Sequence, residues 1–205
     1  MVEGTNALIK NFYRLNLDTN CFKDSFDFDS FLHKIKTREF IEPTLYPYNL
    51  KKENDLISKE WLQYMKDIGL EPRSLIFFYR EENYQHWGAH IDLNDSTGDN
   101  DRIYAVNWTI DPEDKSEMTW YNLPENWREQ VEYSMIGSAY AEWPIETLTE
   151  AGERCTIGTT PTLVRTDIPH TVFMKDNFRL SLSFRFDLKF LDWNDVTSYF
   201  NPYFL

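Results

Sequence analysis

The chain has 205 residues, of which 41% are hydrophobic and 17% aromatic, so one well-buried domain is feasible and a second is not required. Its formal net charge of −13 disfavours a dedicated nucleic-acid binder, because such binding depends on neutralising phosphates with Lys and Arg. No apolar run is long enough to span a bilayer and no secretory signal is visible, so we expect no membrane segment. Cys21 and Cys155 stand far apart in no metal or redox pattern, which favours reduced thiols in a cytoplasmic protein.

The amino-terminal third predicts two helices. Residues 7–15 could form a short helix or an edge strand, and Ser25–Lys36 has apolar residues at helix spacing. Asn54 or Asp55 could cap a second helix that runs to Ile68, with Gly69 as its end. A break between elements is predicted at Pro43–Pro47. We expect residues 1–73 to support one outer face of a sheet.

From residue 74 onward the pattern changes to that of strands. Strands are predicted at Ser74–Arg80, His86–Asp92, Arg102–Ile110, Glu117–Tyr121 and around Ser138–Trp143, with three more inside Pro161–Phe186. Glu146–Thr160 is predicted to be mostly connection. Eight strands with no convincing helix between them indicate a mainly β fold, a double-stranded β-helix or jelly roll, with residues 74–186 as its core in a single domain of residues 1–205. The aromatic tail, residues 187–205, is predicted to be a covering helix or an edge that packs on a second subunit in a homodimer.

The last predicted strand, Phe178–Phe186, has the clearest alternation in the chain. One face carries polar residues and the other apolar residues: Arg179, Ser181, Ser183 and Arg185 against Leu180, Leu182, Phe184 and Phe186. This pattern predicts an apolar layer on one side of the strand and a polar cavity with a fixed cation on the other.

His90 and Asp92 are two positions apart on a predicted strand, so their side chains point to the same face. His170 begins a later strand. Two imidazoles and one carboxylate form a facial triad, which leaves open positions on a non-haem Fe(II) for a co-substrate and dioxygen. His86 has the same parity as His90 and is an alternative ligand or supporting residue, whereas His33 is predicted to be a surface histidine.

His90, Asp92, His170 and the run Arg179-Leu180-Ser181 resemble the signature of the 2-oxoglutarate and Fe(II)-dependent dioxygenases, over roughly residues 74–186. The resemblance implies that the first three residues hold iron and that Arg179 binds the far carboxylate of 2-oxoglutarate. A guanidinium suits this task because it pairs with a carboxylate bidentately, and Ser181 can add a hydrogen bond.

Family members commonly add a tyrosine to this carboxylate site from the first and third core strands. Tyr79 and Tyr104 are at suitable positions, Asn107 is a competitor, and ordinary core packing is about as probable for each. Arg185 is about 20 Å beyond Arg179 by the rise per residue, which indicates a surface or substrate-side charge.

The resemblance further implies hydroxylation of an unactivated C–H bond, with O2 as oxidant and succinate and CO2 as co-products. The spacing from His170 to Arg179 is similar to that of the prolyl-hydroxylase branch, so the expected substrate is an amino-acid side chain, either in a peptide or as a free amino acid, or another small molecule. The run R-L-S-L-S-F-R is also similar to the arginine-flanked strand of nucleobase-dealkylating enzymes. A cupin-like metal-binding protein without oxygenase activity and a catalytically silent scaffold are the further alternatives.

Overall fold

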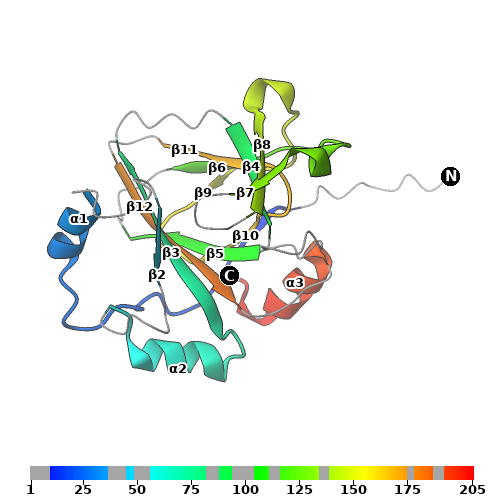
Figure 1. The fold of residues 1–205 in the computed structure, drawn as a ribbon. Helices are drawn as coiled ribbons and strands as arrows, with labels where there is room; N and C mark the ends of the chain where they lie inside the picture. Colours follow the sequence, from blue (N-terminus) through cyan, green and yellow to red (C-terminus); the bar gives the residue numbers. More distant parts are fainter. Residues whose placement is uncertain are drawn as a thin grey trace.

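The structure, a computed structural model, describes residues 10–36, 45–48, 56–81, 88–93, 104–110, 116–133, 139–174, 178–186 and 192–205. Twelve strands form two six-stranded sheets, and every pairing in them is antiparallel (Figure 1). In spatial order, the first sheet contains β1 (Phe12–Arg14), β10 (Thr162–Arg165), β5 (Tyr104–Thr109), β12 (Phe178–Phe186), β3 (Pro72–Glu81) and β2 (Leu45–Tyr48). The second contains β7 (Val131–Tyr133), β8 (Ala139–Pro144), β4 (Gly88–Leu93), β11 (His170–Phe173), β6 (Glu117–Trp120) and β9 (Cys155–Thr156). The prediction of a mainly β protein is confirmed.

Three strands, β2, β7 and β9, are absent from the predicted set, whereas β8 is at the predicted position. The strand expected around Ser138–Trp143 forms β8, which pairs with β4 and, together with β7, extends the second sheet at one edge. The predicted connection Glu146–Thr160 contains β9, whose two residues are too few to produce a pattern in the sequence. At the predicted break, residues 45–48 form β2, and Pro47 is tolerated there because β2 is an edge strand.

The α-helices of the described residues are α1 (Phe28–Lys36), α2 (Lys59–Asp67) and α3 (Trp193–Phe200), and the short 3-10 helices are η1 (Trp127–Gln130), η2 (Ile145–Thr147) and η3 (Asn201–Tyr203). The cap of α2 is Ser58, whose Oγ accepts a hydrogen bond from the Trp61 backbone N–H at 3.2 Å, and the predicted caps Asn54 and Asp55 lie outside the described residues. The predicted stop is confirmed, because Gly69 has φ +80°, a conformation that favours glycine.

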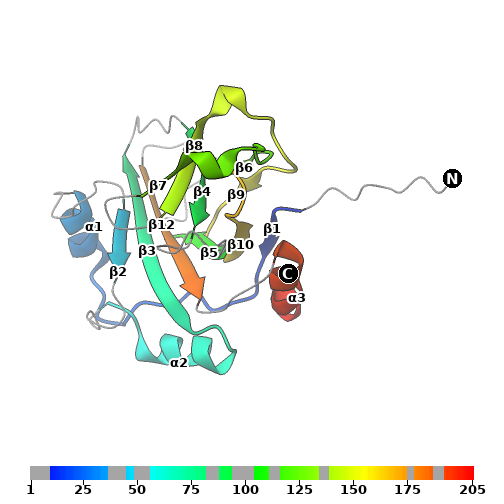
Figure 2. The same ribbon diagram turned by 45° about the vertical axis from the view of Figure 1, so that its right-hand side comes forward.

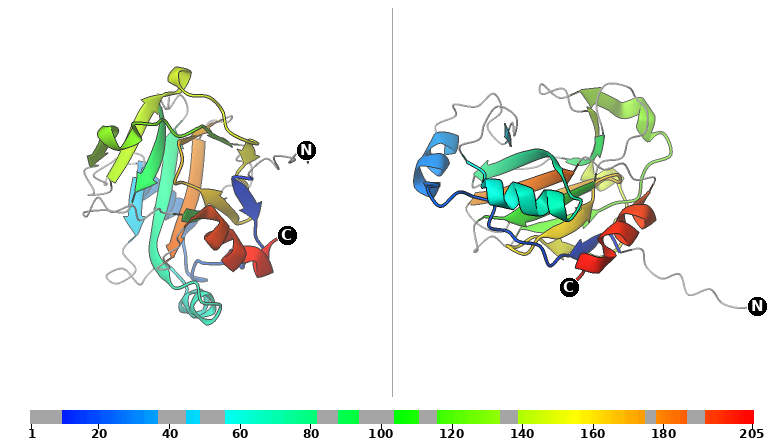
Figure 3. Two further views of the ribbon diagram at one scale, coloured as in Figure 1. Left: turned by 90° about the vertical axis from the view of Figure 1, so that its right-hand side faces the viewer. Right: turned by 90° about the horizontal axis from the view of Figure 1, so that it is seen from below.

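The main core lies between the first sheet and the helices α2 and α3, which cover its outer face (Figure 3). Its members come from both layers, among them Trp61, Met65, Phe77, Trp108, Leu182, Phe184, Val196 and Phe200. The prediction of a covering helix in the tail is confirmed, since α3 packs in this core and the Tyr199 hydroxyl donates a hydrogen bond to the Gly69 carbonyl at 3.1 Å. Among the described residues, no helix is long and apolar enough to cross a membrane.

Candidate metal centre and its cavity

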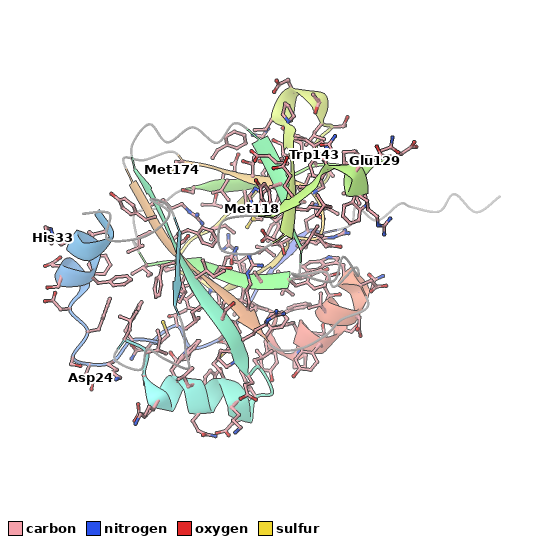
Figure 4. The ribbon with its side chains drawn as sticks, in the orientation of Figure 1. Asp24, His33, Met118, Glu129, Trp143 and Met174 are labelled. Carbon is pink, nitrogen blue, oxygen red and sulfur yellow. The ribbon has the colours of Figure 1, made fainter. Side chains whose placement is uncertain are left out.

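The two faces of β12 divide the structure into a core side and a cavity side. Leu180, Leu182 and Phe184 are fully buried in apolar clusters. The polar face borders a cavity. The remaining lining residues come from several strands of both sheets and from segments next to them: Phe78, His90, Asp92, Asn107, Met118, Thr166, His170, Val172 and Met174, next to Arg179, Ser181, Ser183 and Arg185. Figure 4 marks two of them, Met118 and Met174, which belong to the apolar part of the wall.

His90 and His170 lie directly opposite each other in the pairing of β4 with β11, and their ring centroids are 4.5 Å apart. Asp92 follows on the same face of β4, with its Oδ1 3.8 Å from His90 Nε2. One donor atom from each of these three residues lies within 4.8 Å of the others, so small side-chain rotations would bring all three to a single ion. The structure thus brings together the three residues that the sequence predicts as metal ligands.

His170 has the tautomer that metal binding requires. Its Nδ1 is 3.0 Å from the carbonyl oxygen of Ile168, which can only accept, so Nδ1 carries the proton and Nε2 is left as the donor for a metal. Burial lowers the pKa of His170 below its usual 6.5, although the neighbouring Asp92 opposes this shift. A neutral imidazole is the form that coordinates a cation.

Asp92 is held in its ionised form by Arg185. The Nη2 of Arg185 donates a hydrogen bond of 2.7 Å to Oδ2 of Asp92. Burial would raise the pKa of the Asp92 carboxyl, but the attraction of Arg185 and of the two imidazoles outweighs it and lowers the pKa below its usual 3.8. Of the two interpretations of Arg185, a surface charge or a substrate-side charge, the first is therefore wrong: its side chain is 13% exposed, lines the cavity and contacts Asp92.

Arg179 and Ser181 also line the cavity, at 6% and 2% exposure, on the same strand as Arg185. The cavity therefore contains both a group of possible metal ligands and a guanidinium that could pair with the carboxylate of a bound molecule.

Tyr79 and Tyr104 are on the other side of the first sheet, so their predicted contact with the co-substrate is corrected. Tyr79 pairs with Leu180 and packs in the same apolar cluster. Tyr104 is two positions before Val106 on β5, so both side chains point to the same face of the sheet and belong to the main core. Its hydroxyl is 3.5 Å from Oδ2 of Asp167. The competing residue, Asn107, lies opposite Ser183 of β12, so its side chain is on the other face of the sheet and lines the cavity.

Several lining residues were not predicted. Val172 and Met174 share the face of His170 by strand parity, a signal that was present in the sequence. Thr166 precedes β11 in an irregular segment, where no periodic signal exists. His86 lies outside the described residues, and His33 is exposed on α1, as predicted (Figure 4).

Two imidazoles and one carboxylate suit Fe(II) and related divalent ions that bind nitrogen and oxygen donors. The other buried candidates for metal chemistry, Cys21 and Cys155, have thiols whose pKa burial raises to about 12 and about 11, so both stay protonated at neutral pH.

Searches against family models and against curated proteins find no match to this chain.

Proposed function

We propose that the chain is an Fe(II)- and 2-oxoglutarate-dependent dioxygenase with a jelly-roll fold, acting in the cytoplasm. It would hydroxylate an unactivated C–H bond of an amino-acid side chain, in a peptide or in a free amino acid. The observation that carries the proposal is the convergence of His90, Asp92 and His170 in one cavity with the buried guanidinium of Arg179.

The strand order supports the jelly-roll part of the proposal. Without β1 and β2, the first sheet has the order β10-β5-β12-β3, and without β7 and β8, the second has the order β4-β11-β6-β9. From β3 to β6 and again from β9 to β12, each successive strand belongs to the other sheet. Two four-stranded antiparallel sheets connected in this way are the arrangement expected of a rolled double-stranded β-helix.

His90, Asp92 and His170 would hold Fe(II), and the bound iron with 2-oxoglutarate supplies the activation of dioxygen. The two carboxylate oxygens of Asp92 would have different roles. Oδ2 accepts a hydrogen bond from Arg185, and Oδ1, which faces His90, would bind the metal. The Ile168 carbonyl fixes the imidazole of His170 with Nε2 as its metal donor. The three ligands leave the remaining coordination positions for the co-substrate and dioxygen.

Arg179 would bind the far carboxylate of 2-oxoglutarate. Its guanidinium is almost fully buried, and a charge-assisted pair is stronger where water is excluded. The Ser181 hydroxyl is on the same face of β12 and can add a hydrogen bond. Met118 and Val172, directly opposite each other in β6 and β11, form an apolar wall beside this site that would exclude water from the co-substrate.

The first test is a titration of the protein with Fe(II) and 2-oxoglutarate without oxygen, followed by exposure to air. The proposal expects the weak visible charge-transfer band of the chelate, and then succinate even in the absence of substrate. A screen of peptides and free amino acids for substrate-stimulated succinate formation would identify the substrate class. Iron binding without 2-oxoglutarate binding would favour a cupin-like protein, and binding of neither would favour a silent scaffold.

Dealkylation of a nucleobase is the second candidate, because Arg185 lies inside the cavity with Arg179. Arg179 and Arg185, near the two ends of β12, therefore both line the cavity. This pair of arginines is the feature that resembles the dealkylating enzymes. The net charge of −13 weighs against it. Including methylated single-stranded oligonucleotides in the succinate screen distinguishes the two candidates.

A further inference from the structure

The segment Thr166–Pro169 crosses from β10 in the first sheet to β11 in the second and contacts two of the candidate metal ligands. The Thr166 carbonyl accepts a hydrogen bond of 3.0 Å from the backbone N–H of Asp92. The Ile168 carbonyl, 3.0 Å from Nδ1, fixes the ring of His170. This crossover therefore determines the position of a carboxylate on one strand and of an imidazole on another.

A buried ion pair holds the crossover in place. Arg165, the last residue of β10, donates from Nε to Oδ1 of Asp167 at 2.9 Å and from Nη2 to Oδ2 at 3.3 Å. The side chain of Asp167 is 1% exposed and that of Arg165 is 15% exposed. A two-bond pair between these planar groups fixes direction as well as distance, so it limits the orientation of the backbone between Thr166 and Ile168.

The C-terminal helix supports this ion pair from outside. The guanidinium carbon of Arg165 is 6.0 Å from the centre of the Trp193 ring, within the range of a cation–π contact. Trp193 is 5% exposed, and its Nε1 donates a hydrogen bond of 2.7 Å to the carbonyl of Lys10. Figure 2 shows α3 beside β1 and β10. Arg165 is the last residue of β10, and Lys10 is two positions before the start of β1.

We propose that Arg165 and Asp167, supported by Trp193, form a positioning unit that holds Asp92 and His170 in the geometry a metal requires. The inference rests on the proposed function, since it supposes that these ligands bind a metal. Neither residue of the pair lines the cavity, so the unit acts through the backbone of the crossover. Groups that hydrogen-bond metal ligands typically change metal affinity 10- to 100-fold when they are altered, and the carbonyls of Thr166 and Ile168, which the unit positions, make such bonds.

The test is a titration of Asp167→Asn with Co(II), whose visible absorption reports the ligand geometry without any turnover. The substitution keeps the shape of the side chain and removes its charge. We expect affinity roughly 10- to 100-fold weaker than in the wild type and an altered Co(II) spectrum. Arg154→Gln is the matched control: it breaks the ion pairs of the exposed Arg154 with Glu150 and Glu117, none of which lines the cavity, and should leave the affinity unchanged.

A purely structural role for the pair would lower the melting temperature of Asp167→Asn and leave the affinity and spectrum of the folded protein as they are in the wild type. That result would overturn the inference and keep the metal site. If Asp167→Asn does not fold, Arg165→Lys decides, because it retains the charge and loses the two-bond geometry: weaker Co(II) binding supports the positioning unit and unchanged binding overturns it. A wild-type protein that binds no Co(II) would overturn both the inference and the proposed function.

Discussion

Arg185 on β12 donates a hydrogen bond of 2.7 Å to Asp92 on β4, although 93 positions separate the two residues in the chain. The bond joins the two sheets across the cavity at the carboxylate that we propose as a metal ligand. It also leaves only one carboxylate oxygen directed at the imidazoles, so Asp92 is expected to bind a metal through a single oxygen.

Replacing Arg185 by Gln should weaken Co(II) binding by about tenfold, because Asp92 loses the partner that orients it. The loss should grow as the pH falls. Arg185 lowers the pKa of Asp92, so the stabilisation from this pair is complete above pH 3.8 and is lost as the pH falls through the depressed value. In the variant, protonation of Asp92 should therefore compete with the metal at a higher pH. Equal affinities at every pH from 4 to about 7 would contradict this account, and the exposed Arg128→Gln serves as control.

Asp92→Ala and His170→Ala should each abolish Fe(II) binding and turnover while the protein stays folded. Each removes one of three donors from a cavity wall and leaves the apolar clusters intact. Calorimetric titration with Fe(II) under anaerobic conditions, with circular dichroism as the check on folding, measures both effects. His33→Ala, on the exposed face of α1, should bind the metal normally. Full activity in either ligand variant is incompatible with the assignment.

Arg179→Ala should weaken 2-oxoglutarate binding by about 2–5 kcal/mol, the cost of removing one partner of a shielded charge pair. Tyr79→Phe and Tyr104→Phe should leave it unchanged, since both rings are on the core side of the first sheet. The apparent affinity for 2-oxoglutarate, measured from succinate formation, checks all three variants. A large effect of either tyrosine variant with a small effect of Arg179→Ala would reverse our placement of the carboxylate site.

The metal-free protein should lose stability as the pH falls below about 6.5, and His170 should account for part of the loss. The pKa of His170 is lowered in the folded state, so on acidification the unfolded chain takes up a proton at this residue before the folded chain does. The free energy of unfolding, measured by denaturant titration between pH 5 and about 8, should therefore depend less on pH in His170→Gln than in the wild type. An identical dependence in the two proteins would show that His170 is protonated equally in both states.

Gly69→Ala should destabilise the fold by about 1–3 kcal/mol, because Gly69 has φ +80° and an added Cβ would come within 2.6 Å of the Tyr199 hydroxyl. Gly158→Ala is the matched control: its added Cβ meets no atom within 4 Å. Thermal unfolding of both variants provides the comparison. A melting temperature for Gly69→Ala equal to that of the control would mean that the end of α2 can adopt another conformation at little cost.

Much of the fold and of the site could be predicted because the signals are local. The alternation in Phe178–Phe186 correctly separates the core face from the cavity face, and the spacing of His90 and Asp92 gives a shared face. The meeting of His90 with His170 depends on the pairing of β4 with β11, which no local pattern contains. That part of the prediction rests on the residue types that a metal site requires and on the resemblance to a family.

The errors have equally physical causes. Tyr79 and Tyr104 are on the predicted strands, but successive side chains of a strand point to opposite faces of the sheet. The face on which Tyr79 lies depends on the register that sets it opposite Leu180, and no local pattern contains that register. The distance from Arg179 to Arg185 along β12 does not reveal that Arg185 meets Asp92 on another strand. Predicting such a contact requires the pairing of distant strands.

The direct pairing of His90 with His170 has a consequence for folding. Since the two donors belong to strands far apart in the sequence, an unfolded or half-assembled chain has no high-affinity site, and an ion would stabilise only the completed sandwich. At a free concentration 100 times its dissociation constant, such an ion adds about 2.7 kcal/mol to the free energy of unfolding. Iron supply in the cell would then govern how long this protein survives proteolysis, in addition to whether it is active.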